Sequence, residues 1–306
     1  MISNHRHFLF ALALATACGN YSNEDIDFQL SLPEQSDVEA KLPQALLILD
    51  SAEYYVKTRK AVTDFNGLII KTIALIDYVR SNPPTTRKNN HRVWGPFPSD
   101  THPNWLVQVV MDKEDLPSDP TLLKISYSLK VSPKGSDLFT DLLTGNFQKS
   151  SNSNRGLGHM QWFINNARDK GYPVDADGMV DLLDVTVDYN NATFPRTVHL
   201  STVNQENSDT RGATYDYSEA QDGSGNMTFD WQLATPNLSA KIVSRWQGAG
   251  AGRADLMVTL ANVTWIRDTD CWGPDTRATY IFRKELIPQE PLIGALKTAC
   301  LFPDPL

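Results

Sequence analysis

The clearest pattern along the chain is an alternation of apolar and polar residues that begins beyond Arg92. Such a period of two places alternate side chains on opposite faces of a β-strand. One buried face and one wet face are typical of antiparallel sheets. The best examples are residues 105–112, 124–131 and 183–189.

Turn residues separate these strands from their neighbours. The Asp-Gly-Ser-Gly run inside 221–226 divides residues 214–219 from 227–233, and this is the strongest hairpin signal in the chain. A glycine-alanine run at 248–252 divides two further strands. With the remaining candidates, the chain holds roughly ten strands in meander order. These candidates are residues 138–149, 156–164, 198–202, 241–247, 255–261 and 276–284.

A different period precedes the strands. Residues 46–80 contain no proline, and apolar side chains recur there at three-to-four spacing, which predicts a helix. Asn66 and Gly67 leave open whether it is one helix or two. Asn82-Pro83-Pro84 ends it. The predicted fold is mainly β with an N-terminal helical segment (α+β): a curved antiparallel meander sheet or half-open barrel packed on a long helix.

The N-terminus has the layout of an export signal. Residues 1–7 carry weak positive charge, residues 8–15 are uninterruptedly apolar, and Leu14-Ala15-Thr16-Ala17-Cys18 follows. The apolar run is too short for a transmembrane helix. An ordinary secretory signal with a chance cysteine is the alternative to lipidation.

This segment resembles the lipobox of bacterial lipoproteins. The resemblance implies cleavage after residue 17, a lipid on Cys18, and a protein that is exported and anchored to a membrane. Gly19, in place of an aspartate after the cysteine, implies the outer membrane. The resemblance concerns the anchor only and says nothing about an activity.

The rest of the chain divides into two parts. Residues 18–42 are polar and acidic with little periodicity, and we expect a flexible tether. Residues 43–306 have no linker-like stretch between 92 and 284, and we expect one helix-plus-sheet domain. Cys271 and Cys300 form an even pair in an exported chain, so a disulfide should tie down the proline-rich tail. The alternatives are a metal site and a catalytic thiol, and neither is supported, because no Cys or His stands at ligand spacing from either cysteine.

Composition narrows the partners. The net charge is −8, and no run of Lys or Arg occurs, which argues against nucleic acid. No HExxH, GxSxG, phosphate-binding or dinucleotide motif is present, so we expect no cofactor, and an enzyme is the less favoured reading.

Two local sites stand out. The small-residue run before the aromatic strand makes His159 and Trp162, and with them Trp105, candidate pocket residues, although glycines in a strand more often mark a bend. Asp175 and Asp177 are a weak candidate for calcium, because the pattern of a calcium loop is incomplete and a solvated turn explains them as well. No other metal site is expected.

Seven tryptophans lie in the β region. Large aromatic side chains on the inner face of a curved sheet can line an apolar cavity, as they do in small β-barrels that bind one ligand. In this architectural sense the chain resembles periplasmic lipoprotein carriers, which implies an apolar ligand. Three hypotheses follow. The first is a non-enzymatic lipid-anchored protein that binds an apolar ligand or an envelope protein. The second is a hydrolase of envelope or extracellular polymer that uses acids around 181–188. The third is a purely structural envelope component.

Overall fold

The computed structural model describes residues 22–30, 32, 34–42, 51–115, 122–150, 155–177, 179–206, 209–283, 292–295 and 299–303. The predicted signal peptide and Cys18 lie outside these residues. Among the described helices, none is both long and apolar enough to cross a bilayer.

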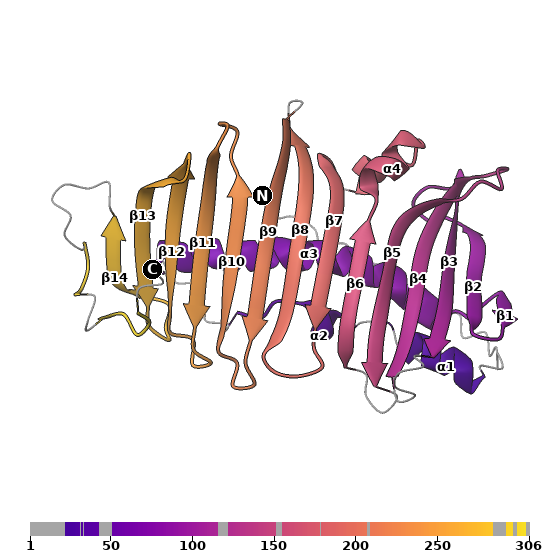
Figure 1. The fold of residues 1–306 in the computed structure, drawn as a ribbon, viewed down its shortest axis with the longest axis horizontal. Coiled ribbons are helices and arrows are strands. Elements are labelled where there is room, and N and C mark those ends of the chain that lie inside the picture. The colour runs from indigo at the N-terminus through magenta and orange to yellow at the C-terminus, as the bar shows by residue number, and fades with distance from the viewer. Residues whose placement is uncertain are drawn as a thin grey trace, which may run out of the picture.

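The described part of the chain forms one antiparallel sheet of fourteen strands in simple sequential order, β1 to β14 (Figure 1). The sheet is curved and unclosed, with β1 and β14 at its two edges. The predicted mainly β, antiparallel meander is therefore confirmed. The strands are β1 (Thr86–Lys88), β2 (His91–Pro98), β3 (Trp105–Asp115), β4 (Leu122–Pro133), β5 (Thr140–Ser150), β6 (Gly156–Trp162), β7 (Leu182–Asn190), β8 (Arg196–Glu206), β9 (Asp209–Glu219), β10 (Gly225–Gln232), β11 (Leu238–Trp246), β12 (Gly252–Leu260), β13 (Val263–Trp272) and β14 (Ala278–Arg283).

Within the described ranges, five helical segments accompany the sheet. They are α1 (Asn23–Leu30), α2 (Gln35–Val38), α3 (Glu53–Ser81), α4 (Ile164–Asp169) and the 3₁₀ turn η1 (Val174–Asp177). The helix α3 has 29 residues and continues through Asn66 and Gly67. It begins at Glu53, later than the pattern suggested, and ends before Pro83. In Figure 1 it runs across the sheet behind the strands.

The first half of α3 has one buried stripe. Its members recur every three or four residues, and the apolar ones belong to two apolar clusters found among the described residues. The ring of Tyr55 lies 5.4 Å from that of Trp272, and the ring of Phe65 lies 5.8 Å from that of Tyr215. The buried side chains are Tyr54, Tyr55, Thr58, Ala61, Val62, Phe65 and Ile69.

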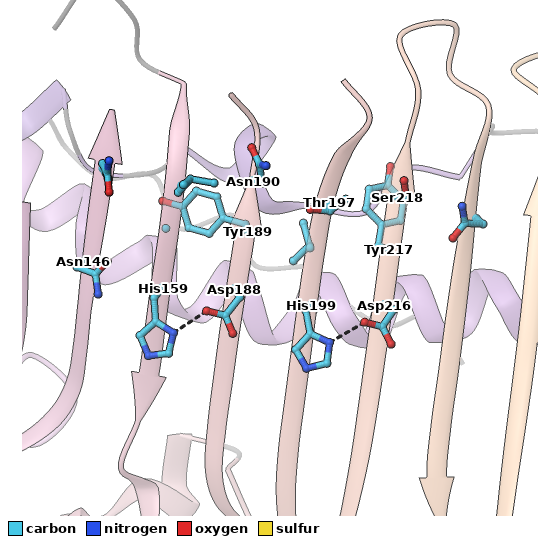
Figure 2. Close-up of a pocket in the computed structure, with 15 residues that line it drawn as sticks. Asn146, His159, Asp188, Tyr189, Asn190, Thr197, His199, Asp216, Tyr217 and Ser218 are labelled. Carbon is cyan, nitrogen blue, oxygen red and sulfur yellow. Dashed lines mark hydrogen bonds and ion pairs between the residues drawn. The ribbon is translucent and has the colours of Figure 1, made fainter. Parts of the chain in front are cut away.

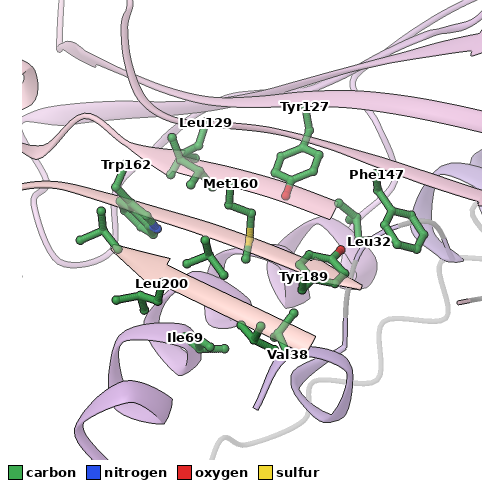
Figure 3. Packing of buried hydrophobic residues seen from close by; sticks show 14 of the residues in the cluster. Leu32, Val38, Ile69, Tyr127, Leu129, Phe147, Met160, Trp162, Tyr189 and Leu200 are labelled. Carbon is green, nitrogen blue, oxygen red and sulfur yellow. The ribbon is translucent and has the colours of Figure 1, made fainter. Parts of the chain in front are cut away.

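Glycines on the inner face of the sheet lie beneath large aromatic rings. The ring of Tyr189 covers Gly158 on the neighbouring strand, and a Cβ on Gly158 would stand 2.0 Å from Tyr189 Cζ. The same cross-strand arrangement recurs three more times (Figure 3 labels Tyr127 and Tyr189). These glycines make room for the rings. The other pairs are Tyr127 over Gly145, Trp246 over Gly225, and Trp272 over Gly252.

The expected tether at 18–42 is wrong for the residues that are described, from Ser22 on. Phe28, Leu32 and Val38 are buried in the main core. Asp25 is fully buried and accepts hydrogen bonds from Arg92 Nε at 2.6 Å and from Arg87 Nε at 2.9 Å. The sequence does not predict this order, because the few apolar residues of the segment follow no period and acidic side chains are usually exposed to solvent. The folded domain therefore includes this segment.

The predicted disulfide joins Cys271 to Cys300, with 5.5 Å between the Cα atoms. It holds residues 299–303 against β11 and β12. There Arg253 Nη1 donates to the carbonyl oxygen of Phe302, and Arg245 Nη2 donates to that of Pro303. The expectation of a tied-down tail is confirmed for these described residues.

We predict that Asp25→Asn lowers the free energy of unfolding by about 3 kcal/mol, because it removes the buried carboxylate that pairs with the buried Arg92. Burial raises the pKa of Asp25, but hydrogen bonds from Ser22, Arg92 and Arg87 outweigh it and hold the pKa at about 2. A lowered pKa stabilises the fold above the unfolded value near 4, and this contribution of about 2 kcal/mol is lost between pH 4 and pH 2.

Urea unfolding of both proteins at pH 6, 4 and 3 measures this. The wild type should lose stability on acidification faster than Asp25→Asn. Parallel pH profiles for the two proteins would contradict the assignment.

A pair of glycine variants tests the packing of rings on the sheet. Gly158→Ala should destabilise the protein by about 1–3 kcal/mol, because its Cβ would collide with the ring of Tyr189. Gly67→Ala, in the middle of α3, meets no atom within 4 Å and should stabilise it by about 0.5–1 kcal/mol. Thermal unfolding followed by circular dichroism compares the two. Equal effects would show that the ring contact does not restrict position 158.

Candidate functional site

The outer face of the sheet, which points away from the apolar clusters, is polar over β5 to β10. On β6, for example, Gly158, Met160 and Trp162 are buried, whereas Leu157, His159 and Gln161 are not. This is the wet set of positions in the alternation that predicted the strands. The outer face is the part of the sheet where side chains are available to a ligand.

One row of outer side chains crosses six strands at right angles. Each member is the direct cross-strand partner of the next, so neighbours are about 5 Å apart. We call this the central row. From β5 to β10 it consists of Asn146, His159, Asp188, His199, Asp216 and Thr228.

Two histidines of the central row are held by aspartates on the following strand. His159 Nδ1 lies 2.7 Å from Asp188 Oδ1, and His199 Nδ1 lies 2.6 Å from Asp216 Oδ1 (Figure 2). A carboxylate only accepts, so Nδ1–H is the donor in both pairs. In the neutral imidazole this fixes the tautomer and leaves Nε2 as an acceptor.

A third pair stands on the same row nearer the β1 edge. His91 Nδ1 lies 2.7 Å from Asp112 Oδ1, and Asp112 is in register with Ser126, which is in register with Asn146. Three of the four histidines beyond Cys18 are therefore oriented in the same way, on one face and in one line.

The central row lies in a shallow, open concavity of about 680 Å³. Above the row, as drawn in Figure 2, are amide and hydroxyl side chains such as those of Asn190 and Ser218. Leu157 also lines the concavity. No Lys or Arg is among the fifteen residues that line the concavity, whereas Asp188 and Asp216 are. With neutral histidines the lining therefore carries two negative charges and many acceptors. The flanking polar residues are Gln148, Asn190, Thr197, Ser218 and Asn226.

The three predicted pocket residues do not come together. His159 is at the centre of the concavity, but Trp162 is buried on the opposite face, because it lies three positions further along β6 and an odd step in a strand changes the face. Trp105 is half-buried at the start of β3, where its ring meets Tyr172 edge-on at 5.2 Å. Gly158 leaves room for the ring of Tyr189 and is also one of the residues that line the concavity.

The acids singled out from the sequence have separate roles. Asp175 accepts a hydrogen bond from Arg168 Nη2 at 2.8 Å, and the side chain of Asp177 is outside the described set. Within the described residues no group of three or more His, Cys, Asp or Glu is placed to hold a metal ion. Burial raises the pKa of Asp184. This residue lies on β7 four positions before Asp188, with Thr186 between them on the same face.

Comparisons with known proteins add nothing to this geometry. The chain matches no protein-family model, no curated protein and no solved structure. The function has to be argued from the site.

The His–Asp pairs should contribute little to stability, because all four side chains are between 38% and 58% exposed. We predict that Asp188→Asn and Asp216→Asn each change the free energy of unfolding by less than about 1 kcal/mol. Urea unfolding at pH 7 measures it. A loss of several kcal/mol in either variant would mean that the row holds the sheet together and is not maintained for a ligand.

Proposed function

We propose that this chain is an exported, lipid-anchored, non-enzymatic protein of the cell envelope that binds a neutral, hydroxyl-rich polysaccharide on the outer face of its sheet. The observation that carries the proposal is the central row, in which oriented imidazoles and carboxylates stand in register inside a polar concavity.

The export signal and the lipobox support the anchor. The described fold begins close to it in sequence, since Ser22, the first described residue, is four positions after Cys18. Four extended residues span at most about 14 Å. An anchored protein would therefore be held near the membrane surface.

The chemistry of the lining supports the ligand class. Imidazole Nε2, carboxylate and amide oxygens accept hydrogen bonds, and the amides of Asn146, Gln148 and Asn190 also donate. Hydroxyl groups of a sugar satisfy both kinds of group. An acidic polymer would meet the charges of Asp188 and Asp216. An open, straight row across several strands suits an extended chain better than a small enclosed ligand.

An apolar ligand has less support. Most of the aromatic side chains that suggested it are packed into the core, including Trp94, Trp162, Trp246 and Trp272. The described concavity on the sheet is lined by polar residues. The carrier-like reading of the fold therefore gives way to surface binding.

A hydrolase is the second candidate, and the His–Asp pairs favour it, because an oriented imidazole is a general base. Both histidines lie on an open face and are hydrogen-bonded to aspartates, and neither of these bonds joins a histidine to a nucleophilic hydroxyl or thiol. Release of reducing sugar from a bound polysaccharide, abolished in His159→Ala, would establish this candidate in place of simple binding.

The anchor is tested with Cys18→Ser. The wild-type protein expressed in a Gram-negative host should incorporate radiolabelled palmitate and fractionate with membranes. Cys18→Ser should take up no label and appear in the soluble envelope fraction. Cys271→Ser is the matched control and should still be labelled. Label on Cys18→Ser would contradict lipidation at this residue.

Binding is tested by affinity electrophoresis of the Cys18→Ser protein through gels that contain dextran, mannan, galactan or β-glucan, with alginate as the acidic counterpart. At least one neutral polymer should retard the protein, and alginate should not. The double variant His159→Ala/His199→Ala should bind at least tenfold more weakly, since two hydrogen bonds of about 1 kcal/mol each are removed.

Lys124→Ala is the control, because Lys124 points outward on β4 without lining the concavity. Retardation that survives in the double variant, or that alginate produces equally well, would contradict the proposed surface. Failure of every neutral polymer would contradict the ligand class.

A further inference from the structure

A second concavity, of about 450 Å³, lies at one end of the strands. Its walls come from α2 and Lys41 of the N-terminal segment, from the start of β6, and from the turns that join β7 to β8 and β9 to β10. In Figure 1 these two turns and the helices α1 and α2 lie along the same lower border of the sheet. The first described helix, α1, therefore lies along the same border of the sheet as this concavity.

The lining of this end pocket is basic, unlike the chain as a whole. Lys41, Arg155 and Arg196 line it in a protein of net charge −8. Arg155 lies over the ring of Phe194 at 5.7 Å, which places its guanidinium against the β7–β8 turn. Arg196 is buried, and its Nη1 donates to the carbonyl oxygen of Ser36.

The two carboxylates of the end pocket are already engaged within the protein. Glu219 accepts from Arg196 Nε and from the hydroxyl of Tyr217. Asp222 accepts from the backbone N–H of Ser224 at 2.9 Å and from its hydroxyl at 2.6 Å, which closes the β9–β10 turn. The lining therefore carries three cations and two acids, and Lys41 Nζ also lies 3.6 Å from Glu39 Oε1. A ligand would meet Lys41 and Arg155 before Arg196, which is buried behind its partners.

Asn191 supplies an independent sign of a missing partner. It is 7% exposed, lines the end pocket, and its Oδ1 accepts from the backbone N–H of Gly156 at 2.7 Å. That bond fixes the orientation of the amide, so Nδ2 is the remaining donor, and no acceptor is within reach of it among the described residues. A buried donor without an acceptor is costly, so an acceptor brought by a ligand would be favoured there.

We infer that the end pocket binds a phosphate group, held by Lys41, Arg155 and the amide of Asn191. Phosphate offers several acceptor oxygens and up to two negative charges to this set of donors. Arginine and lysine are the side chains that proteins use for this group. The source is either a free phosphate compound or the headgroup of a membrane lipid. The second source rests on the lipid anchor proposed above, because only an anchored protein holds this end close to headgroups.

The experiment uses the Cys18→Ser protein without its signal peptide, so that lipidation plays no part. Isothermal titration with inorganic phosphate and with glycerol 3-phosphate tests the free compounds. Flotation with phosphatidylcholine vesicles, with and without phosphatidylglycerol, tests the headgroups. We expect binding in at least one arm, and the arm identifies the source.

The double variant Lys41→Gln/Arg155→Gln should weaken that binding at least tenfold, and Lys124→Gln, a cation elsewhere on the surface, should leave it unchanged. Thermal unfolding confirms that both variants are folded. Absence of binding in every arm, or an equal loss in the Lys124→Gln control, would overturn the inference.

Retardation by neutral polysaccharide and labelling by palmitate, measured on the same double variant in the wild-type Cys18 background, should be unaffected. Their failure would count against the proposed function alone.

Discussion

The structure depends on keeping water away from the inner face of a sheet that does not close. A barrel buries its interior by closure, but β1 and β14 remain apart, so other elements have to cover the apolar face. The inner row from Tyr127 to Ile242 is apolar from strand to strand. The buried stripe of α3 and the apolar residues of the N-terminal segment join it in the same clusters.

Polar contacts fix where this cover begins. The backbone N–H of Tyr54, in the first turn of α3, donates to Asp270 on β13 at 3.0 Å, and the Tyr54 hydroxyl donates to Asp268 at 2.8 Å. Asp270 also accepts from Arg283 Nη1 at 2.6 Å. Ala52 precedes the helix and makes no side-chain cap, so a carboxylate from the sheet satisfies an N–H that the helix itself leaves open. At the opposite end of the sheet Asp25 plays the corresponding part for β1 and β2.

The same contacts explain what could be predicted from the sequence. Strands with one solvent-exposed face, such as β4 and β7, can be predicted from the alternation of apolar and polar residues. The pattern fails on β13, because Asp268 and Asp270 point into the molecule and Cys271 lies under the tail, and it fails on β2, where prolines interrupt the run. The segment 22–42 was misjudged for a similar reason, since its helix α1 is held by one buried aspartate and a few scattered apolar side chains.

The central row was beyond the reach of the sequence for a different reason. His159, Asp188, His199 and Asp216 each occupy a wet position in their own strand, and that much the alternation gives. Whether they meet depends on the register of the strands. Register is set by turns and by irregularities such as the shift between Leu182 and Asp184 on β7, and a shift of one residue would turn the aspartate to the core. His159 was singled out with Trp162, its neighbour in sequence, although its partners come from β7.

The row continues beyond β10, and its continuation indicates what it suits. After Thr228 come Val243, Asp255 and Thr269, in register across β11 to β13. Here the outer face is covered by the protein's own tail, and Asp255 is fully buried, bound by Arg253 and by the hydroxyl of Thr269 at 2.6 Å. The tail brings the carbonyl oxygens of Pro303 and Phe302 to Arg245 and Arg253, so the donors of this part are matched by main-chain acceptors. Over β5 to β10 the described residues include no such covering segment, and the acceptors of the row face outward. The proposed polysaccharide, an extended chain that carries hydroxyl donors along its length, would supply donors to these acceptors.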